Sequence, residues 1–274
     1  MHKILLPTDF SENSGKANKY VINIFGKDAA YTLMHAWYMP NYSTEMVLPV
    51  DDVLAEEVKI ELDKEREALL KKSPDLKIKT KMSYGDAVGC IDDMVEEIKA
   101  DLIVMGTKGS SGMAEILVGS NTASVIQSVT VPVLAIPEQA EVKLPKKIVF
   151  ATDLHEISSP KVIKPLKEIV QKLSAHILVL NVMKEHEAPD LDKTLEREKL
   201  ENLFTGLDYS YHIILADKQE IAHAIDEFIH REKADMVAMI ARKANLFDRI
   251  FHKSITHKIA LHTDIPLLAM HDLG

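Results

Sequence analysis

Short apolar runs of strand length alternate along the chain with longer stretches whose apolar residues recur at helical spacing. The first run, 3–9, is followed by a stretch that Ser11 or Ser14 can cap and that continues to about Phe25. Further strands are predicted at 31–37, 76–83 and 102–105, and further helices at 51–72 and from 85 to about 100. The alternation predicts an α/β fold, in which helices cover both faces of a parallel sheet in a doubly wound, Rossmann-like arrangement.

The same alternation occurs twice. The pattern of Lys3 to Asp9 returns at 147–153, and residues 234–239 match 100–105 at an offset of 134 residues. The apolar run 265–270 matches 131–136 at the same offset. The sequence therefore predicts two tandem copies of one domain, over residues 1–141 and 142–274.

The stretch from Asp101 to Pro137 carries the clearest chemical signal. A strand-length run breaks on Gly106 and Gly109, and Gly119-Ser120 then precedes an amphipathic stretch. Glycines let backbone amides approach an anion, and the first amides of a helix are unpaired at the positive end of its dipole. Ser120 and Thr122 can add hydroxyl donors. Phosphate groups of a nucleotide suit such a site.

Residues from two separate strands are expected to face one another. In doubly wound sheets, ligands bind beyond the carboxyl ends of the strands, near the point where strand order reverses. Pro7, Thr8 and Asp9 end the first strand, and Met105 and Gly106 end the fourth. We expect these residues to border one cleft.

Composition excludes several classes of protein. The formal net charge of −9 argues against a nucleic-acid partner, because phosphate backbones need a basic surface. The single cysteine, Cys90, leaves no internal disulfide and fits a reducing compartment. The apolar stretch near the N-terminus is too short for a secretory signal, and no run approaches the length of a membrane span. The prediction is a cytoplasmic protein without membrane contact.

The spacing Gly-x2-Gly-x9-Gly-Ser, between DLIVMG and VPVLAIP, resembles the ATP-binding signature of the universal stress protein family. The resemblance extends over the whole chain as two such domains. It implies an adenine nucleotide, ATP or else ADP or AMP, bound in the first domain. The residues implied at this nucleotide are Pro7, Thr8, Asp9, His35, Met105, Gly106, Lys108, Gly109, Gly119, Ser120, Asn121 and Thr122.

Some of these residues have a second interpretation. Asp9 could bond the ribose or help to hold Mg²⁺, or it could only cap the following loop or helix. His35 could lie at the adenine, or it could be a satisfied core residue. Lys108 could reach a phosphate as a point charge or remain solvated.

The second copy departs from the nucleotide motif. At the offset of 134 residues, Ile240 replaces Gly106, Lys243 replaces Gly109, and Lys253 replaces Gly119. Side chains then fill the space where phosphates would approach the backbone. We therefore expect a degenerate loop in this domain and no ATP bound as in the first.

Three functions remain open from the sequence. The first is a nucleotide-binding regulatory protein of the stress response, since the sequence shows no recognisable catalytic base. The second is an enzyme, a slow ATPase or nucleotidyl transferase that uses Asp9 with magnesium. The third is a scaffold in which the two domains pack as an internal pseudo-dimer through the VPVLAIP and IPLLAM strands. Edge strands would also allow a homodimer.

Overall fold

The computed structural model describes most of the chain as two compact units, residues 1–131 and 132–274. The described residues are 2–38, 50–107, 120–154, 156–183, 191–216, 221–241 and 264–272. Each unit is considered by itself. The domain limits expected from the sequence, 1–141 and 142–274, stay a prediction.

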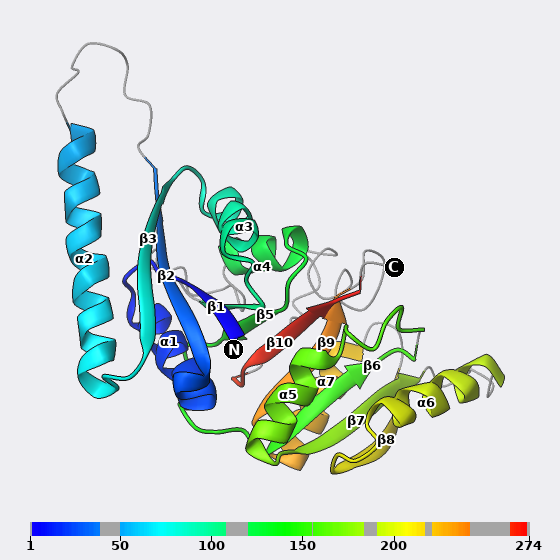
Figure 1. Cartoon of the computed structure of the whole chain (residues 1–274). Coiled ribbons are helices and arrows are strands. Elements are labelled where there is room, and N and C mark those ends of the chain that lie inside the picture. Colours follow the sequence, from blue (N-terminus) through cyan, green and yellow to red (C-terminus); the bar gives the residue numbers. More distant parts are fainter. Residues whose placement is uncertain are drawn as a thin grey trace. The chain divides into compact units, whose positions relative to one another are not determined.

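The first unit is a doubly wound parallel sheet, as predicted. Its strands lie in the order β3-β2-β1-β4, and the pairings of β1 with β2, β1 with β4 and β2 with β3 are all parallel. Helices α1 and α2 cover one face, and α3 and α4 cover the other (Figure 1). The elements are β1 His2–Pro7, α1 Glu12–Phe25, η1 Gly26–Asp28, β2 Ala29–Trp37, α2 Val50–Lys72, β3 Lys77–Tyr84, α3 Ala87–Ile98, β4 Leu102–Gly106 and α4 Ser120–Ser128.

The local sequence explains where these elements begin and where they are buried. Ser11 caps α1, because its side chain accepts a hydrogen bond from the Ser14 amide at 3.2 Å. β1 contributes three fully buried leucine and isoleucine side chains to the core, since parallel strands are covered on both faces. β3 ends the strand order and has only one buried residue, Ile78, which confirms the predicted edge strand.

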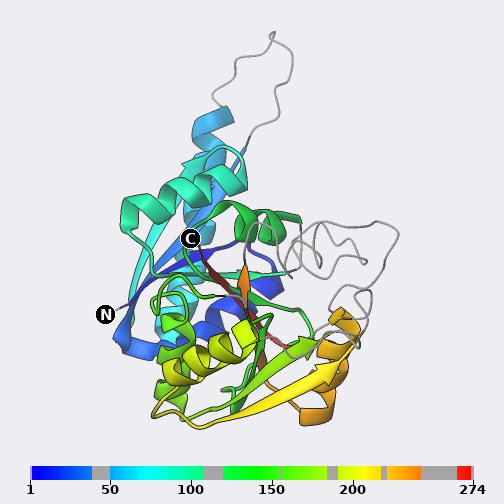
Figure 2. The ribbon, with the colours of Figure 1, turned by 90° about the vertical axis from the view of Figure 1, so that its right-hand side faces the viewer.

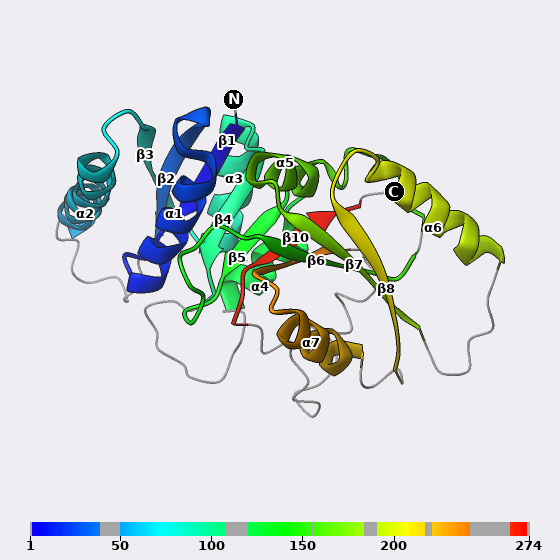
Figure 3. The ribbon, with the colours of Figure 1, turned by 90° about the horizontal axis from the view of Figure 1, so that it is seen from below.

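The second unit repeats this winding and has one antiparallel strand in addition. Its order is β5-β10-β9-β6-β7-β8, and β5 pairs antiparallel with β10. Helices α5 and α6 lie on one face and α7 on the other (Figure 3), and β8 forms the margin of the sheet (Figure 2). The elements are β5 Val133–Ile136, β6 Lys147–Thr152, α5 Lys164–Leu173, β7 His176–Met183, α6 Leu191–Leu203, β8 Tyr209–Leu215, α7 Ile221–Glu232, β9 Met236–Ala241 and β10 Leu267–His271.

Both units contain the same turn just before one strand, β4 in the first unit and β9 in the second. In the first, the Lys3 amide donates to the Asp101 carboxylate at 2.8 Å, and the Asp101 amide donates to the Lys3 carbonyl at 2.8 Å. In the second, Lys147 and Asp235 make the same pair of bonds, at 3.0 and 2.8 Å. Lys99 and Lys233, two residues before each aspartate, both have positive φ. The repeat seen in the sequence is thus a repeat of hydrogen bonding.

No helix among the described ranges combines the length and the apolar character that crossing a membrane requires.

The turn at Asp235 leads to a prediction about pH. Partial burial alone would raise the pKa of Asp235, but the amides of Lys146 and Lys147 and the Lys143 ammonium hold it below its ordinary value. Asp235→Ala should therefore lower the free energy of unfolding at pH 7 by about 2–3 kcal/mol, the range for hydrogen bonds to a charged group. A depressed carboxyl pKa stabilises the fold above the ordinary aspartate value, and this stabilisation is lost as the pH falls through the lowered value.

Urea unfolding at pH 7 and at about pH 3 would measure this effect, since unperturbed aspartate titrates near pH 3.9. The difference between wild type and the variant should shrink at the lower pH. Asp208→Ala is the control, because the Asp208 side chain is 78% exposed and its cost should stay below about 1 kcal/mol. An equal loss in both variants at pH 7 would contradict the prediction.

Candidate functional site

The strand order of the first unit reverses between β1 and β4. β1 leads through α1 to β2 on one side, whereas β4 lies on its other side. A crevice opens at such a point because the connections leave the two strands toward opposite faces of the sheet. The residues that end β1 and β4 are Pro7 and Gly106, two of the predicted site residues.

Thr8 is held in this region by several hydrogen bonds, and it is only 6% exposed. Its hydroxyl donates to the Glu65 carboxylate at 2.9 Å and accepts from the Phe10 amide at 3.0 Å. The Ser14 hydroxyl lies 3.0 Å from the same oxygen. The Thr8 amide donates to the Met34 carbonyl at 2.8 Å and so continues the β1 to β2 ladder. Thr8 therefore fixes the turn after β1 to three other elements.

Asp9 lies within this turn and is partly exposed. One carboxylate oxygen accepts a hydrogen bond from the Ser11 amide at 3.1 Å. This is the local capping bond that the sequence offered as the alternative to a ligand role. Ser11 in turn caps α1, so Asp9 supports the start of the helix from the crevice side. A role for Asp9 at a ribose or a magnesium ion stays a prediction.

His35 belongs to β2 and is half-buried. Its Nδ1 lies 2.7 Å from the Thr8 carbonyl, so this nitrogen carries the proton and donates. Its ring stacks on Phe10, with 4.5 Å between the ring centroids and 23° between the planes. The histidine is thus placed beside Thr8 and Asp9, and both of its contacts shape the turn.

Gly106 is required by packing as well as by the proposed phosphate approach. A Cβ atom at this position would lie 2.6 Å from Nδ2 of Asn13 and 3.0 Å from the Asn13 backbone carbon. Such distances are closer than real contacts, so any side chain here would push α1 away from β4. Nothing in the sequence pattern indicated this contact between Gly106 and Asn13.

Thr122 ties the start of α4 to the end of β4. It is 2% exposed, and its hydroxyl donates to the Gly106 carbonyl at 2.9 Å. The sequence predicts that this hydroxyl donates to a phosphate. To do so, the hydroxyl would have to give up its bond to the Gly106 carbonyl. Met105, one residue before Gly106, is 8% exposed, and Asn121 is exposed. The predicted residues Lys108, Gly109 and Gly119 and the side chain of Ser120 lie outside the described residues.

Glu65 and Asn18 are the residues that the sequence analysis missed. The Asn18 amide donates to the second Glu65 oxygen at 2.7 Å, so the carboxylate joins α2 to α1 and to Thr8. Burial raises the pKa of Glu65 and the nearby Asp9 adds to this, although the bonds from Thr8 and Asn18 and the charge of Lys19 act the other way. Asn18 lies on the buried face of α1, where a polar residue needs a partner. The position of Asn18 on this face was the sequence signal that could have indicated a buried polar partner.

The second unit retains the turn but not all of its partners. Leu154 occupies the place of Phe10, and its amide donates to the Thr152 hydroxyl at 3.2 Å. Phe10 and Leu154 both have positive φ, at 63° and 56°. Asn181 takes the place of His35, donating to the Thr152 carbonyl at 3.1 Å. Ile240, the predicted replacement for Gly106, lies in β9. The positions of Lys243 and Lys253 are outside the described residues.

Metal binding finds no support from clusters of side chains. Within the described ranges, no three or more His, Cys, Asp or Glu side chains are grouped so that they could hold a metal ion. Asp9 could therefore contribute to a magnesium site only together with oxygen atoms of a bound ligand, such as phosphate groups.

Comparison with solved structures defines the class of fold. A universal stress protein from Archaeoglobus fulgidus superposes with a TM-score of 0.71 at 22% identity, covering 98% of this chain and 96% of that one. A putative universal stress protein from Pseudomonas aeruginosa gives 0.60 at 13% identity, covering 99% and 93%. At these identities the likeness concerns the fold. The chain has the tandem architecture of these proteins.

Sequence comparison establishes the family. The model of the universal stress protein family matches residues 1–137 and again 145–271. The universal stress protein MJ0531 of Methanocaldococcus jannaschii is 36% identical over 150 residues, or 53% of this chain and 84% of that relative. Universal stress protein G of Salmonella typhimurium is 37% identical over 60 residues, or 22% and 42%. The chain belongs to the universal stress protein family and carries two of its domains, which confirms the resemblance.

The buried carboxyl of Glu65 leads to a second prediction about pH. Glu65→Gln keeps the size and one acceptor oxygen but removes the charge, and its NH2 can donate to the buried Asn18 Oδ1 if the Asn18 amide turns over. Its free energy of unfolding at pH 7 should therefore equal or exceed that of wild type. Glu65→Ala should lose about 1–3 kcal/mol, because Thr8 and Asn18 lose their acceptor. A carboxyl with a raised pKa is least favourable when ionised, so its stabilising contribution is present at low pH and lost as the pH rises through the raised value.

Urea unfolding of the three proteins between about pH 5 and pH 8 would test this, because unperturbed glutamate titrates near pH 4.3. Wild type should approach Glu65→Gln in stability toward the lower pH. If Glu65→Gln were as unstable as Glu65→Ala across the range, the charge rather than the hydrogen bonds would be what holds α2.

Proposed function

We propose that this protein binds an adenine nucleotide in its first repeat and acts as a regulatory protein of the stress response. The observation that carries the proposal is the meeting of Thr8, Asp9 and Gly106 where strand order reverses between β1 and β4. Ligands of doubly wound sheets bind at such points. Membership of the universal stress protein family supports the stress-related role.

In the proposed complex, the backbone around Thr8 and His35 borders the adenine, and Met105 supplies an apolar contact. Asp9 bonds the ribose or a magnesium ion held by the phosphates. The phosphates themselves lie along the glycine-bearing loop between Gly106 and α4, where free amides can face them. The residues proposed to line this loop are Lys108, Gly109, Gly119, Ser120, Asn121 and Thr122.

The second repeat is proposed not to bind ATP in this way. Ile240, Lys243 and Lys253 replace the three glycines of the motif, so side chains occupy the space that phosphates need. Regulation in this proposal depends on the unequal repeats, of which only the first responds to nucleotide.

The pseudo-dimer of the repeats is a further part of the proposal. It rests on the two apolar runs that the sequence names as the contact region of the repeats, at 131–136 and 265–270. We propose that the repeats pack as an internal pseudo-dimer. A solution scattering profile of two separately tumbling domains would contradict that packing.

Calorimetric titration with ATP, ADP and AMP, with and without magnesium, tests nucleotide binding. We expect one saturable site per chain. Gly119→Lys introduces the residue that the second repeat has at Lys253, and it should weaken binding at least about tenfold, or 1.4 kcal/mol. Asp9→Asn should lower the affinity most when magnesium is present, since the amide is a poorer magnesium ligand than a carboxylate.

Lys253→Gly is the matched control for Gly119→Lys, because it changes the same position of the repeat that is proposed not to bind. Its nucleotide affinity should equal that of wild type. The absence of saturable heat at millimolar nucleotide would remove the proposal, and equal affinity of Gly119→Lys and wild type would remove the assigned loop. Mass spectrometry of protein purified without added nucleotide would identify the ligand carried from the cell.

A further inference from the structure

A groove lies between α1 and α2 of the first unit, beside the turn after β1. Its volume is about 390 Å³, which falls within the range of small-molecule sites. Apolar surface comes from Phe10, Ala68 and Leu69, and Leu69 is 7% exposed. Lys19 and Lys72 contribute cationic groups to the lining. Neither belongs to the predicted nucleotide site.

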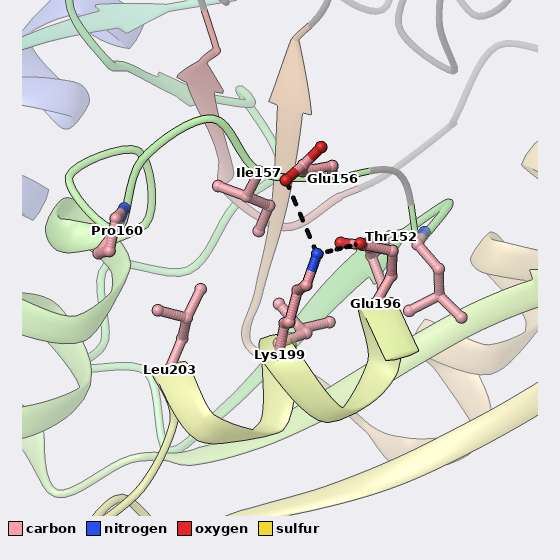
Figure 4. A pocket seen from close by; sticks show the side chains of 9 residues that line it. Thr152, Glu156, Ile157, Pro160, Glu196, Lys199 and Leu203 are labelled. Atoms are coloured by element: carbon pink, nitrogen blue, oxygen red, sulfur yellow. Dashed lines mark hydrogen bonds and ion pairs between the residues drawn. The ribbon is translucent and has the colours of Figure 1, made fainter. Parts of the chain in front are cut away.

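The second unit has a pocket in the equivalent place, formed by α6 and the turn after β6 (Figure 4). The strand pairings of the two sheets make Ile78 of β3 equivalent to Tyr209 of β8. Lys72 and Leu203 end the preceding helices, and each lies six residues before these positions. The two helices therefore correspond at an offset of 131 residues, from 209 minus 78. Matched pairs that line both cavities are Glu65 with Glu196, Ala68 with Lys199, and Leu69 with Leu200.

The two cavities differ in size, and the pair Ala68 and Lys199 is one place where their linings differ. The cavity of the second unit holds only about 120 Å³. In it, the Lys199 ammonium lies 2.6 Å from the Glu196 carboxylate and 3.7 Å from that of Glu156, so its side chain extends between two acidic residues that line the pocket (Figure 4). The first unit has only the methyl group of Ala68 at this position, and its groove stays open.

The charges of the open groove are unevenly paired. The Lys64 ammonium is bonded to Glu61 at 2.6 Å, and Glu65 is bonded to Thr8 and Asn18. Among the described residues, Lys72 forms no ion pair, and it lies one helical turn from the buried Leu69. An apolar surface beside an unpaired ammonium matches an apolar chain that ends in one carboxylate.

We propose that the groove between α1 and α2 is a second ligand site of this protein, for a free amphipathic monocarboxylate such as a medium-chain fatty acid. The chain lies against Phe10, Ala68 and Leu69, and the carboxylate pairs with Lys72 and Lys19. This ligand would touch Phe10, which stacks on His35, and would therefore lie against the turn that borders the nucleotide crevice. The site does not depend on whether nucleotide binds.

Titration of the full chain with decanoate, followed by calorimetry and by the methyl NMR signals of leucine and alanine, tests this site. We expect saturable binding with shifts at Leu69 and Ala68. Ala68→Lys gives the first groove the residue that closes the second, and it should weaken decanoate binding at least tenfold. Ala and Lys are both good helix formers, and Ala68 is exposed, so the variant should fold.

Ala55→Lys is the matched control, because it adds the same side chain to α2 thirteen residues earlier, about 20 Å along the helix. It should bind decanoate as wild type does. Lys72→Leu, which introduces the residue found at Leu203, should weaken binding several-fold and reduce its dependence on salt. Decyltrimethylammonium, with the same chain and the opposite charge, should bind at least tenfold more weakly than decanoate.

Three results would overturn the proposal. Wild type with no saturable decanoate binding would remove the site, and Ala68→Lys that bound as wild type does would place any bound decanoate elsewhere. Decyltrimethylammonium binding as tightly as decanoate, with Lys72→Leu unchanged, would show that the groove does not select a carboxylate.

Discussion

The hydroxyl of Thr8 is the interaction on which the candidate site depends. A hydroxyl has one proton to donate and two lone pairs to accept with. It donates to Glu65 of α2, accepts from the Phe10 amide and adjoins the Ser14 hydroxyl of α1. Because these partners come from separate elements, the turn after β1 cannot move without breaking bonds to both helices. The crevice between β1 and β4 is therefore bordered by a fixed backbone.

The two repeats share the parts that hold the sheet and differ in the parts that are proposed to contact ligands. Asp101 and Asp235 make the same bonds to the strand beside them, and Thr8 and Thr152 hold the same turn. By contrast, the glycines of the phosphate motif and the residue at Ala68 are replaced in the second repeat by larger side chains. The change at Ala68 accompanies a smaller cavity in the second repeat. Divergence has thus acted on cavities while the framework was kept.

The sequence predicted the fold well because the fold depends on patterns that repeat. Strands buried on both faces appear in the sequence as apolar runs, and the second copy of the domain shows the same pattern of runs again. The cap at Ser11 and the edge strand β3 could also be predicted, because each depends on residues that are close together in the sequence.

The contacts within the site were harder to predict, because they join residues far apart in the chain. Glu65 lies in a helix rich in charged residues, and periodicity does not say which acidic residue turns inward. Gly106 was assigned to the phosphates from the motif, whereas its contact with Asn13 depends on how closely α1 approaches β4. His35 was known to end a buried strand, but its stacking on Phe10 requires the shape of the turn.

That shape has a consequence for the history of the chain. Phe10 and Leu154 both hold a left-handed backbone, at a cost of about 1–2 kcal/mol for a residue with a side chain, when glycine would relieve it. A costly conformation is unlikely to arise twice at the same place by chance, so both copies inherited it from a single ancestral domain. The turn is accordingly older than the duplication, whereas the two copies differ at the three glycine positions of the first.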